Sequence, residues 1–169
     1  KNKPKALVPV NNLPMIFHLF RKYPDKRFVV IGDYHKEVLR EYLTCFAGGN
    51  VQLIDAEGTG TCSGIRQALE WIPEKEPFML VWSDLILPEN FDLPHEYEEN
   101  HKPENDYIGI SVSFPCRWRY TEGSLEEKSS REHGVAGCFL FTGKNKLEEV
   151  PESGELVRWM QQKKMQFRE

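Results

Sequence analysis

Residues 55–69 read Asp55-Ala-Glu-Gly-Thr-Gly-Thr-Cys-Ser-Gly-Ile-Arg-Gln-Ala-Leu69, a polar, glycine-rich turn that runs from a strand-like segment straight into an amphipathic helix. Gly58 and Gly60 allow the backbone to pass close to a flat or anionic ligand. Thr59 and Thr61 bring hydroxyl groups to the unpaired N–H groups of a helix start. The turn therefore suits a bound nucleotide, although glycine and threonine ahead of a helix more often reflect ordinary turn and capping chemistry.

Short apolar segments alternate with helical patterns around this turn. The strand-like runs are rich in β-branched or aromatic residues, as buried parallel strands tend to be, and they cover residues 6–10, 27–31, 51–54 and 78–82. Apolar residues at helical spacing lie between them, at residues 15–20, 38–46 and 65–72. The alternation predicts right-handed βαβ units and hence a doubly wound, Rossmann-like α/β sheet with helices on both faces.

The pattern changes after residue 105. Antiparallel or mixed strands are predicted at residues 106–114, 117–120, 125–128 and 135–141, followed by helices at 144–150 and 154–164. Residues 165–169, Met165-Gln-Phe-Arg-Glu169, are typical of a strand that is just beginning. The sheet as a whole is therefore expected to be mixed.

Length and composition indicate a compact domain. The chain has 169 residues, 40% of them hydrophobic, which is enough to bury a substantial core, so we expect residues 1–169 to form a single domain. A net charge of -4 gives no basic footprint and argues against nucleic acid as a partner. There is no apolar run of bilayer length and no signal peptide, so a soluble, cytoplasmic protein without a membrane partner is expected.

Three further segments carry motifs at the boundaries of predicted elements. They are Lys3-Pro-Lys-Ala-Leu-Val-Pro-Val-Asn-Asn-Leu-Pro-Met-Ile-Phe-His18, Phe78-Met-Leu-Val-Trp-Ser-Asp84, and Ser124-Leu-Glu-Glu-Lys128 followed by Gly134-Val-Ala-Gly-Cys-Phe-Leu-Phe141. With residues 55–69, these motifs follow the order of one enzyme family over nearly the whole chain. The sequence resembles the sugar-1-phosphate nucleotidyltransferases, the pyrophosphorylase-like enzymes of nucleotide-sugar biosynthesis, some branches of which make CDP-alcohols such as CDP-choline.

The resemblance implies a fold of the nucleotide-diphospho-sugar transferase type and Mg²⁺ as the cofactor. It implies two substrates, a nucleoside triphosphate (NTP) and a phosphorylated sugar or alcohol such as phosphocholine. Members of the family open with a strand and a Gly-x-Gly-x-Arg type loop around the triphosphate, and they carry a second metal-binding Asp or Asn near the other end. Neither is found in these residues, so the domain is expected to be incomplete at both ends.

Asp84 follows the strand-like run at residues 78–82. Ligands of open α/β sheets sit at the carboxyl ends of strands, where a carboxylate can hold Mg²⁺ against phosphates, although an Asp that caps the next turn fits equally well. The resemblance favours the metal, with Ser83 replacing the glycine of the family's Gly-Asp pair. Lys5 matches the lysine of the family's Pro-Lys-x-Leu context, in which an ammonium stabilises the α-phosphate during transfer, and Lys3 is the alternative.

Glu127 and Lys128 match a Glu-Lys pair of the family, in which the acid accepts sugar hydroxyls and the lysine meets the sugar phosphate. A solvated surface pair explains the same dipeptide, and Ser129 stands where the family has proline. Gly137 would let the strand backbone approach the sugar, or it merely permits tight packing. Trp118 and Tyr120, flanked by arginines, suit either base stacking or a cation–π face on a hairpin.

These residues lead to one functional hypothesis and one alternative. The hypothesis is a nucleotidyltransferase that joins the nucleoside monophosphate of an NTP to a phosphorylated sugar or alcohol and releases pyrophosphate. The alternative is a catalytically inactive nucleotidyltransferase-like domain that serves as a regulatory or assembly module. The missing triphosphate loop and Ser83 favour the alternative, whereas the order of the motifs favours the enzyme.

Overall fold

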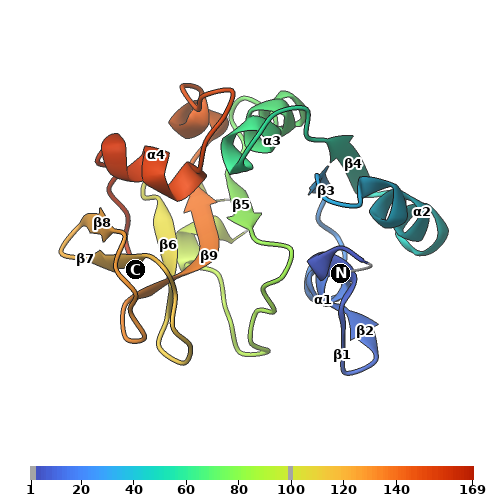
Figure 1. Ribbon diagram of the computed structural model, residues 1–169. Coiled ribbons are helices and arrows are strands. Elements are labelled where there is room, and N and C mark those ends of the chain that lie inside the picture. The colour runs from blue at the N-terminus through green and yellow to red at the C-terminus, as the bar shows by residue number, and fades with distance from the viewer. Residues whose placement is uncertain (1–2, 99–100) are drawn as a thin grey trace.

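A computed structural model describes residues 3–98 and 101–169, and it arranges them around two sheets that lie side by side (Figure 1). One sheet has two parallel strands and the other has five strands, and a separate two-stranded hairpin lies near the amino end. Across the described residues, no helix is long and apolar enough to cross a membrane.

The parallel sheet pairs β3 (Phe28–Gly32) with β4 (Val51–Asp55), and α2 (Lys36–Phe46) connects the two strands. A parallel pair requires a crossover of this kind, so the predicted βαβ unit is confirmed. The register ends with Gly32 opposite Asp55. The glycine-rich turn therefore starts at the carboxyl edge of this sheet.

One face of the parallel sheet is covered by α2 together with α1 (Met15–Lys22). Phe20 of α1 packs edge-on against Phe28 of β3, with ring centroids 4.8 Å apart. Val30 of β3 is buried in the same cluster. These contacts hold the helices against the strands by apolar burial.

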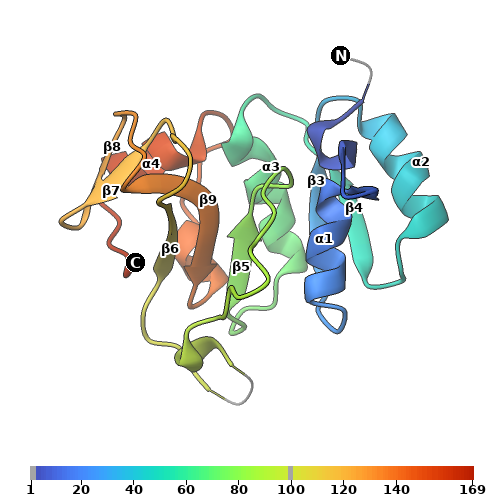
Figure 2. The ribbon, with the colours of Figure 1, turned by 90° about the horizontal axis from the view of Figure 1, so that it is seen from below.

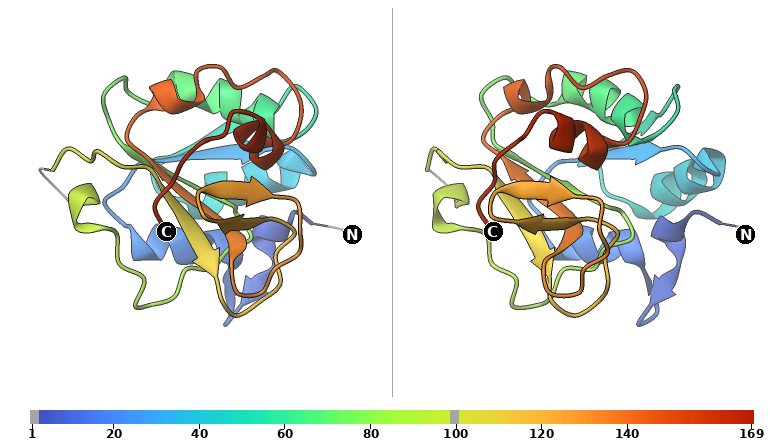
Figure 3. Two further views of the ribbon diagram at one scale, coloured as in Figure 1. Left: turned by 90° about the vertical axis from the view of Figure 1, so that its left-hand side faces the viewer. Right: turned by 60° about the vertical axis from the view of Figure 1, so that its left-hand side comes forward.

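The opposite face is covered by α3 (Thr61–Ala68), so helices lie on both sides of β3 as predicted (Figures 2 and 3). Successive side chains of a strand point to opposite faces, which directs Ile31 toward α3. A Cβ atom at Gly64 would lie only 2.3 Å from the Ile31 side chain. Glycine at position 64 is therefore what allows α3 to pack so closely on the sheet.

The second sheet is antiparallel and has the order β5-β9-β7-β8, with β6 also paired to β9. Its strands are β5 (Phe78–Val81), β6 (Tyr107–Ser111), β7 (Arg119–Thr121), β8 (Ser124–Glu126) and β9 (Gly134–Phe141). The larger core lies between this sheet and α4 (Leu156–Gln162), and Phe139, Phe141 and Met160 are completely buried there. Within residues 165–169, where a beginning strand was predicted, Arg168 forms only an isolated parallel bridge with Tyr107 and no strand develops.

The two sheets share a helix but no strand pairing. Among the strands in residues 3–98 and 101–169, β3 pairs only with β4, and β5 pairs only with β9. Helix α3 joins them, because Gly64 meets Ile31 while Cys62 and Ile65 belong to the larger core. The mixed α/β architecture is thus confirmed, but β5 finds its partner in an antiparallel strand rather than in the predicted parallel one.

The prediction of a strand over residues 6–10 is wrong. The segment instead forms a 3-10 helix and a hairpin: Lys5–Leu7, β1 (Pro9–Val10) and β2 (Leu13–Pro14). Asn11 and Asn12 form the two-residue turn of this hairpin, with φ angles of 49° and 62°. Hairpin turns of this length favour positive φ, which asparagine tolerates better than most residues, so the turn chemistry prevailed over the apolar pattern.

The helix predicted over residues 144–150 is also shorter than expected. The remaining 3-10 helices of the described chain cover Leu69–Trp71, His95–Tyr97 and Lys144–Leu147. The Val150 N–H group bonds to the Leu147 carbonyl, which continues the tight geometry rather than an α-helix. Pro151 then prevents the helix from extending, because proline disfavours helical geometry in the residue before it.

Candidate active site

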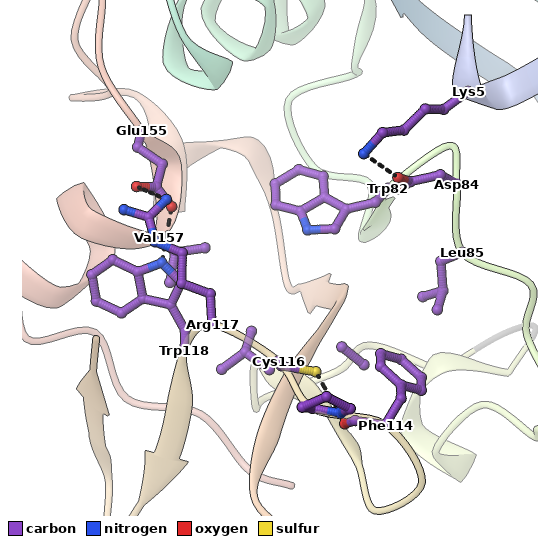
Figure 4. A pocket seen from close by; sticks show the side chains of 13 residues that line it. Lys5, Trp82, Asp84, Leu85, Phe114, Cys116, Arg117, Trp118, Glu155 and Val157 are labelled. Carbon is purple, nitrogen blue, oxygen red and sulfur yellow. Dashed lines mark hydrogen bonds and ion pairs between the residues drawn. The ribbon is translucent and has the colours of Figure 1, made fainter. Parts of the chain in front are cut away.

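A pocket of about 520 Å³ opens beside the end of β5. Its walls come from five places in the chain, namely the 3-10 helix at Lys5, the loop after β5, the loop before β7, the start of β9 and the start of α4. Figure 4 shows Lys5 and Asp84 on one side of this pocket and Glu155, Arg117 and Trp118 on the other. The pocket thus has two chemically different ends.

The first end brings together the two candidate catalytic residues. Lys5 Nζ lies 3.4 Å from Asp84 Oδ2 although 79 residues separate them in the chain. The Lys5 side chain is 79% exposed and that of Asp84 39% exposed. An ion pair so open to water is weak, so a phosphate or a cation can replace either partner at little cost.

Trp82 lies between the two ends in this view (Figure 4) and rests on Gly137. Gly137 has a φ of +84°, and a Cβ atom there would lie 1.8 Å from the Trp82 ring. The backbone N–H of Trp82 also donates to the Gly137 carbonyl at 2.9 Å. The open backbone predicted at Gly137 therefore faces an indole ring, and the neighbouring Ala136 lines the pocket.

The second end is a network of two arginines and two glutamates around Trp118. Arg117 donates to Glu127 Oε1 through Nε, at 2.9 Å, and through Nη2. Arg158 Nη2 donates to Glu127 Oε2 at 2.6 Å. Trp118 Nε1 donates to Glu155 Oε1 at 2.9 Å, and Arg117 Nη1 lies 3.4 Å from Glu155 Oε2. Each carboxylate is therefore held by at least two donors or cations.

The electrostatics of this network follow from its geometry. The hydrogen bond from Arg117 is the main cause that lowers the pKa of Glu127, and the same bond raises the pKa of Arg117. The guanidinium carbon atoms of Arg117 and Arg158 lie 6.0 and 5.8 Å from the centre of the Trp118 ring. Trp118 thus lies within cation–π distance of two arginines, which is the cation–π alternative predicted for this hairpin.

Only one member of the predicted Glu127–Lys128 pair belongs to this network. Glu127 is part of the arginine network and is not a wall of the pocket, although it holds Arg117, which is one. Lys128 is exposed and lies outside the pocket wall, and its backbone N–H donates to the Glu126 carbonyl at 2.9 Å. The structure therefore does not bring Lys128 to the candidate site.

The glycine-rich turn packs against residues 152–156. A Cβ atom at Gly60 would lie 2.3 Å from the Gly154 carbonyl oxygen, and the φ of Gly60 is +80°. A Cβ atom at Gly58 would lie 2.9 Å from the Glu152 carbonyl oxygen. Both glycines are thus required for packing, so a larger residue at either position would disturb the fold as well as any bound nucleotide.

The two threonines of the turn have different partners. Thr61 Oγ1 accepts a hydrogen bond of 2.8 Å from the backbone N–H of Leu156, the first residue of α4. Thr59 uses its carbonyl oxygen, which accepts from the Gly154 N–H at 3.0 Å. The Thr61 hydroxyl thus has a structural role, whereas the exposed Thr59 hydroxyl is free of described partners.

Valine at the two threonine positions separates these roles. We expect Thr61→Val to lower the free energy of unfolding by about 1 kcal/mol, because the Leu156 N–H at the start of α4 loses its acceptor. Thr59→Val should change stability by less than about 0.5 kcal/mol and should weaken NTP binding. Chemical denaturation and calorimetric titration with NTPs measure the two effects. Unchanged NTP affinity in Thr59→Val would assign the turn to packing alone.

Arg117, Trp118, Glu155 and Arg158 of the arginine network were not among the candidate site residues predicted from the sequence. Arg117 and Trp118 carried a partial signal, because an aromatic residue between arginines already suggested stacking or a cation–π contact. Glu155 carried none, because its position just before α4 becomes visible only once the helix start is known. No group of three or more His, Cys, Asp or Glu side chains able to hold a metal occurs within residues 3–98 and 101–169.

No family model and no curated protein match this sequence. Several solved structures, however, are similar to this chain in fold. HddC from Yersinia pseudotuberculosis complexed with GMP-PN gives a TM-score of 0.65 at 16% identity, over 92% of this chain and 74% of HddC. UDP-glucose pyrophosphorylase complexed with UDP-glucose gives 0.64 at 13% identity, over 95% of this chain and 78% of the pyrophosphorylase. CTP:phosphocholine cytidylyltransferase (LicC) from Streptococcus pneumoniae gives 0.64 at 16% identity, over 98% of this chain and 79% of LicC.

The chain therefore has the nucleotidyltransferase fold, as the resemblance of its motifs predicted. Pyrophosphorylases and cytidylyltransferases share this fold with it. At 13% and 16% identity, the likeness defines the architecture alone.

Proposed function

We propose that this protein is a nucleotidyltransferase that transfers the nucleoside monophosphate of an NTP to a phosphorylated sugar or alcohol. A phosphate oxygen of the acceptor attacks the α-phosphorus, the bond from that phosphorus to the oxygen bridging to the β-phosphate breaks, and pyrophosphate leaves. The observation that supports this reaction best is the Lys5–Asp84 pair, which places an ammonium and a carboxylate together at one end of the pocket.

Lys5 and Asp84 have complementary roles in this proposal. The Lys5 ammonium binds a phosphate oxygen and stabilises the negative charge that develops during transfer. Asp84 would hold Mg²⁺, and a single carboxylate is sufficient for this, because protein-bound Mg²⁺ usually takes its other ligands from substrate phosphates and water. When bound, the metal supplies Lewis-acid stabilisation of the phosphate oxygens.

The glycine-rich turn at Gly58–Thr61 is proposed to hold the nucleoside, with the free Thr59 hydroxyl facing the ligand. The acceptor is proposed to enter the other end of the pocket, beside Arg117 and Glu155. The named ligands of the structural relatives, a guanine nucleotide analogue, UDP-glucose and phosphocholine, are consistent with a nucleotide and a phosphorylated acceptor. We propose a cytoplasmic location, with which the buried free thiols of Cys62, Cys116 and Cys138 are consistent.

A substrate screen tests the proposed reaction. The intact protein is incubated with Mg²⁺, each of the four NTPs, and hexose 1-phosphates or phosphocholine, and pyrophosphate release is followed. We expect turnover for at least one pair of substrates and its loss on adding EDTA. Nucleotide binding without turnover for any pair would instead support the inactive regulatory module.

A further inference from the structure

We propose that Arg117 determines which acceptor the pocket takes, and that it selects a hydroxyl-rich sugar phosphate over an acceptor with a cationic head group. This inference rests on the proposed function, since it assigns the acceptor class of the same pocket. In this arrangement Glu127 is a positioning residue for Arg117.

Arg117 is held in place and still open to a ligand. It lines the pocket, and its side chain is 60% exposed. A guanidinium carries five N–H groups. Two of them donate to Glu127 and a third nitrogen faces Glu155, so N–H groups remain for an acceptor oxygen. Because the side chain is already fixed at both ends of its guanidinium, it loses little entropy when it binds.

Glu127 faces the two arginines rather than the pocket. One of its oxygens accepts from Arg117 and the other from Arg158. Its side chain lies outside the pocket wall. The carboxylate therefore acts on the acceptor only by orienting Arg117.

The charges at this end disfavour a cationic head group. Two arginines and two glutamates sum to a net charge of zero, and the carboxylates are already paired with arginine. A quaternary ammonium is bound through open aromatic faces, but Trp118 is buried and its ring already lies beside the guanidinium groups of Arg117 and Arg158. A cation placed beside Arg117 would also be repelled by it.

A hydroxyl-bearing acceptor matches the same groups. A hydroxyl both donates and accepts, so it can accept from an Arg117 N–H and donate to an oxygen of Glu155, which lines the pocket. A sugar offers several such hydroxyls at fixed spacing. The network therefore fits a hexose phosphate better than phosphocholine.

The test compares Arg117→Gln with Arg119→Gln in the intact protein. Arg119 lies two residues further along the same hairpin and donates to Glu126 through Nε and Nη2, as Arg117 does to Glu127, but it lies outside the pocket wall. We expect Arg117→Gln to raise the KM for the hexose 1-phosphate about ten- to a hundredfold, with kcat and the KM for NTP little changed. Glu127→Gln should raise the same KM less, and Arg119→Gln should leave it unchanged.

Wild-type protein should prefer hexose 1-phosphate to phosphocholine, and Arg117→Gln should reduce that preference. Preference of the wild type for phosphocholine, or equal acceptor KM values in Arg117→Gln and Arg119→Gln, would overturn the inference while leaving the transfer reaction intact. Calorimetric titration with glucose 1-phosphate and phosphocholine gives a second readout. If there is no turnover, but glucose 1-phosphate binds and Arg117→Gln weakens that binding, the proposed function is refuted. The selection of the acceptor by Arg117 would still stand. Binding of neither probe, without turnover, would refute both.

Discussion

Replacing Asp84 with alanine is expected to lower kcat about a thousandfold or more and to leave the free energy of unfolding almost unchanged. A carboxylate that holds Mg²⁺ at the phosphates contributes several kcal/mol to the transition state, and each step of about 1.4 kcal/mol is tenfold in rate. The Asp84 side chain is 39% exposed and pairs only with the exposed Lys5 among the described residues, so its loss removes little from the folded state. Pyrophosphate release and chemical denaturation measure the two quantities.

Asp33 provides a matched control for this experiment. It is an exposed carboxylate directly after β3, as Asp84 follows β5, but it lies outside the pocket. Asp33→Ala should therefore retain kcat. Wild-type turnover by Asp84→Ala would remove Asp84 from the mechanism, and an equal loss in both variants would indicate a general effect of charge rather than a metal site.

Alanine at Gly137 is expected to destabilise the protein by about 3 kcal/mol or more, the largest effect on stability that we predict for a single methyl group. The left-handed backbone at φ +84° accounts for about 1 to 2 kcal/mol of this. The rest comes from the collision of the new Cβ with the Trp82 ring, because the half-buried ring has to move. Since Trp82 lines the pocket, the acceptor KM should rise as well.

Two other glycines separate the causes of this loss. Gly154 has a φ of +111°, and a Cβ atom added there would have no neighbouring atom within 4 Å, so Gly154→Ala should show the backbone cost alone. Gly49 has open space and an ordinary φ, so Gly49→Ala should be nearly neutral. Denaturation curves should rank the three variants in that order. If Gly137→Ala were as stable as Gly154→Ala, the Trp82 ring would have to move aside without lowering the free energy of unfolding.

Local patterns predicted most of the fold. The stripes of α1 and α2 and the apolar runs of β3, β4 and β9 became elements close to the predicted bounds, because each buries the face that its periodicity defines. The amino-terminal segment escaped prediction because its two asparagines, which form a hairpin turn, outweigh the apolar residues around them. The antiparallel pairing of β5 with β9 escaped because both strands are apolar along their whole length, and such a run does not encode the direction of its partner.

The sequence predicted the part of the candidate site that depends only on where a strand ends. Asp84 was expected at the end of a strand, and the fold brings Lys5 to it. Glu127 and the turn glycines were identified from motifs, but their immediate partners come from elsewhere: Arg158 for the glutamate and residues 152–154 for the glycines. Such partners lie on separate elements, so their identity depends on tertiary packing rather than on any spacing in the sequence.

Residues 152–157 connect the glycine-rich turn to the pocket. Gly154 is hydrogen-bonded to both Thr59 and Cys62 at the glycine-rich turn, and the next residue, Glu155, is a wall of the pocket. A nucleotide that shifts the turn must therefore shift the acceptor's surroundings through one peptide unit. Thermodynamic linkage then requires reciprocity: whatever factor the nucleotide applies to the affinity of the acceptor, the acceptor applies to the affinity of the nucleotide.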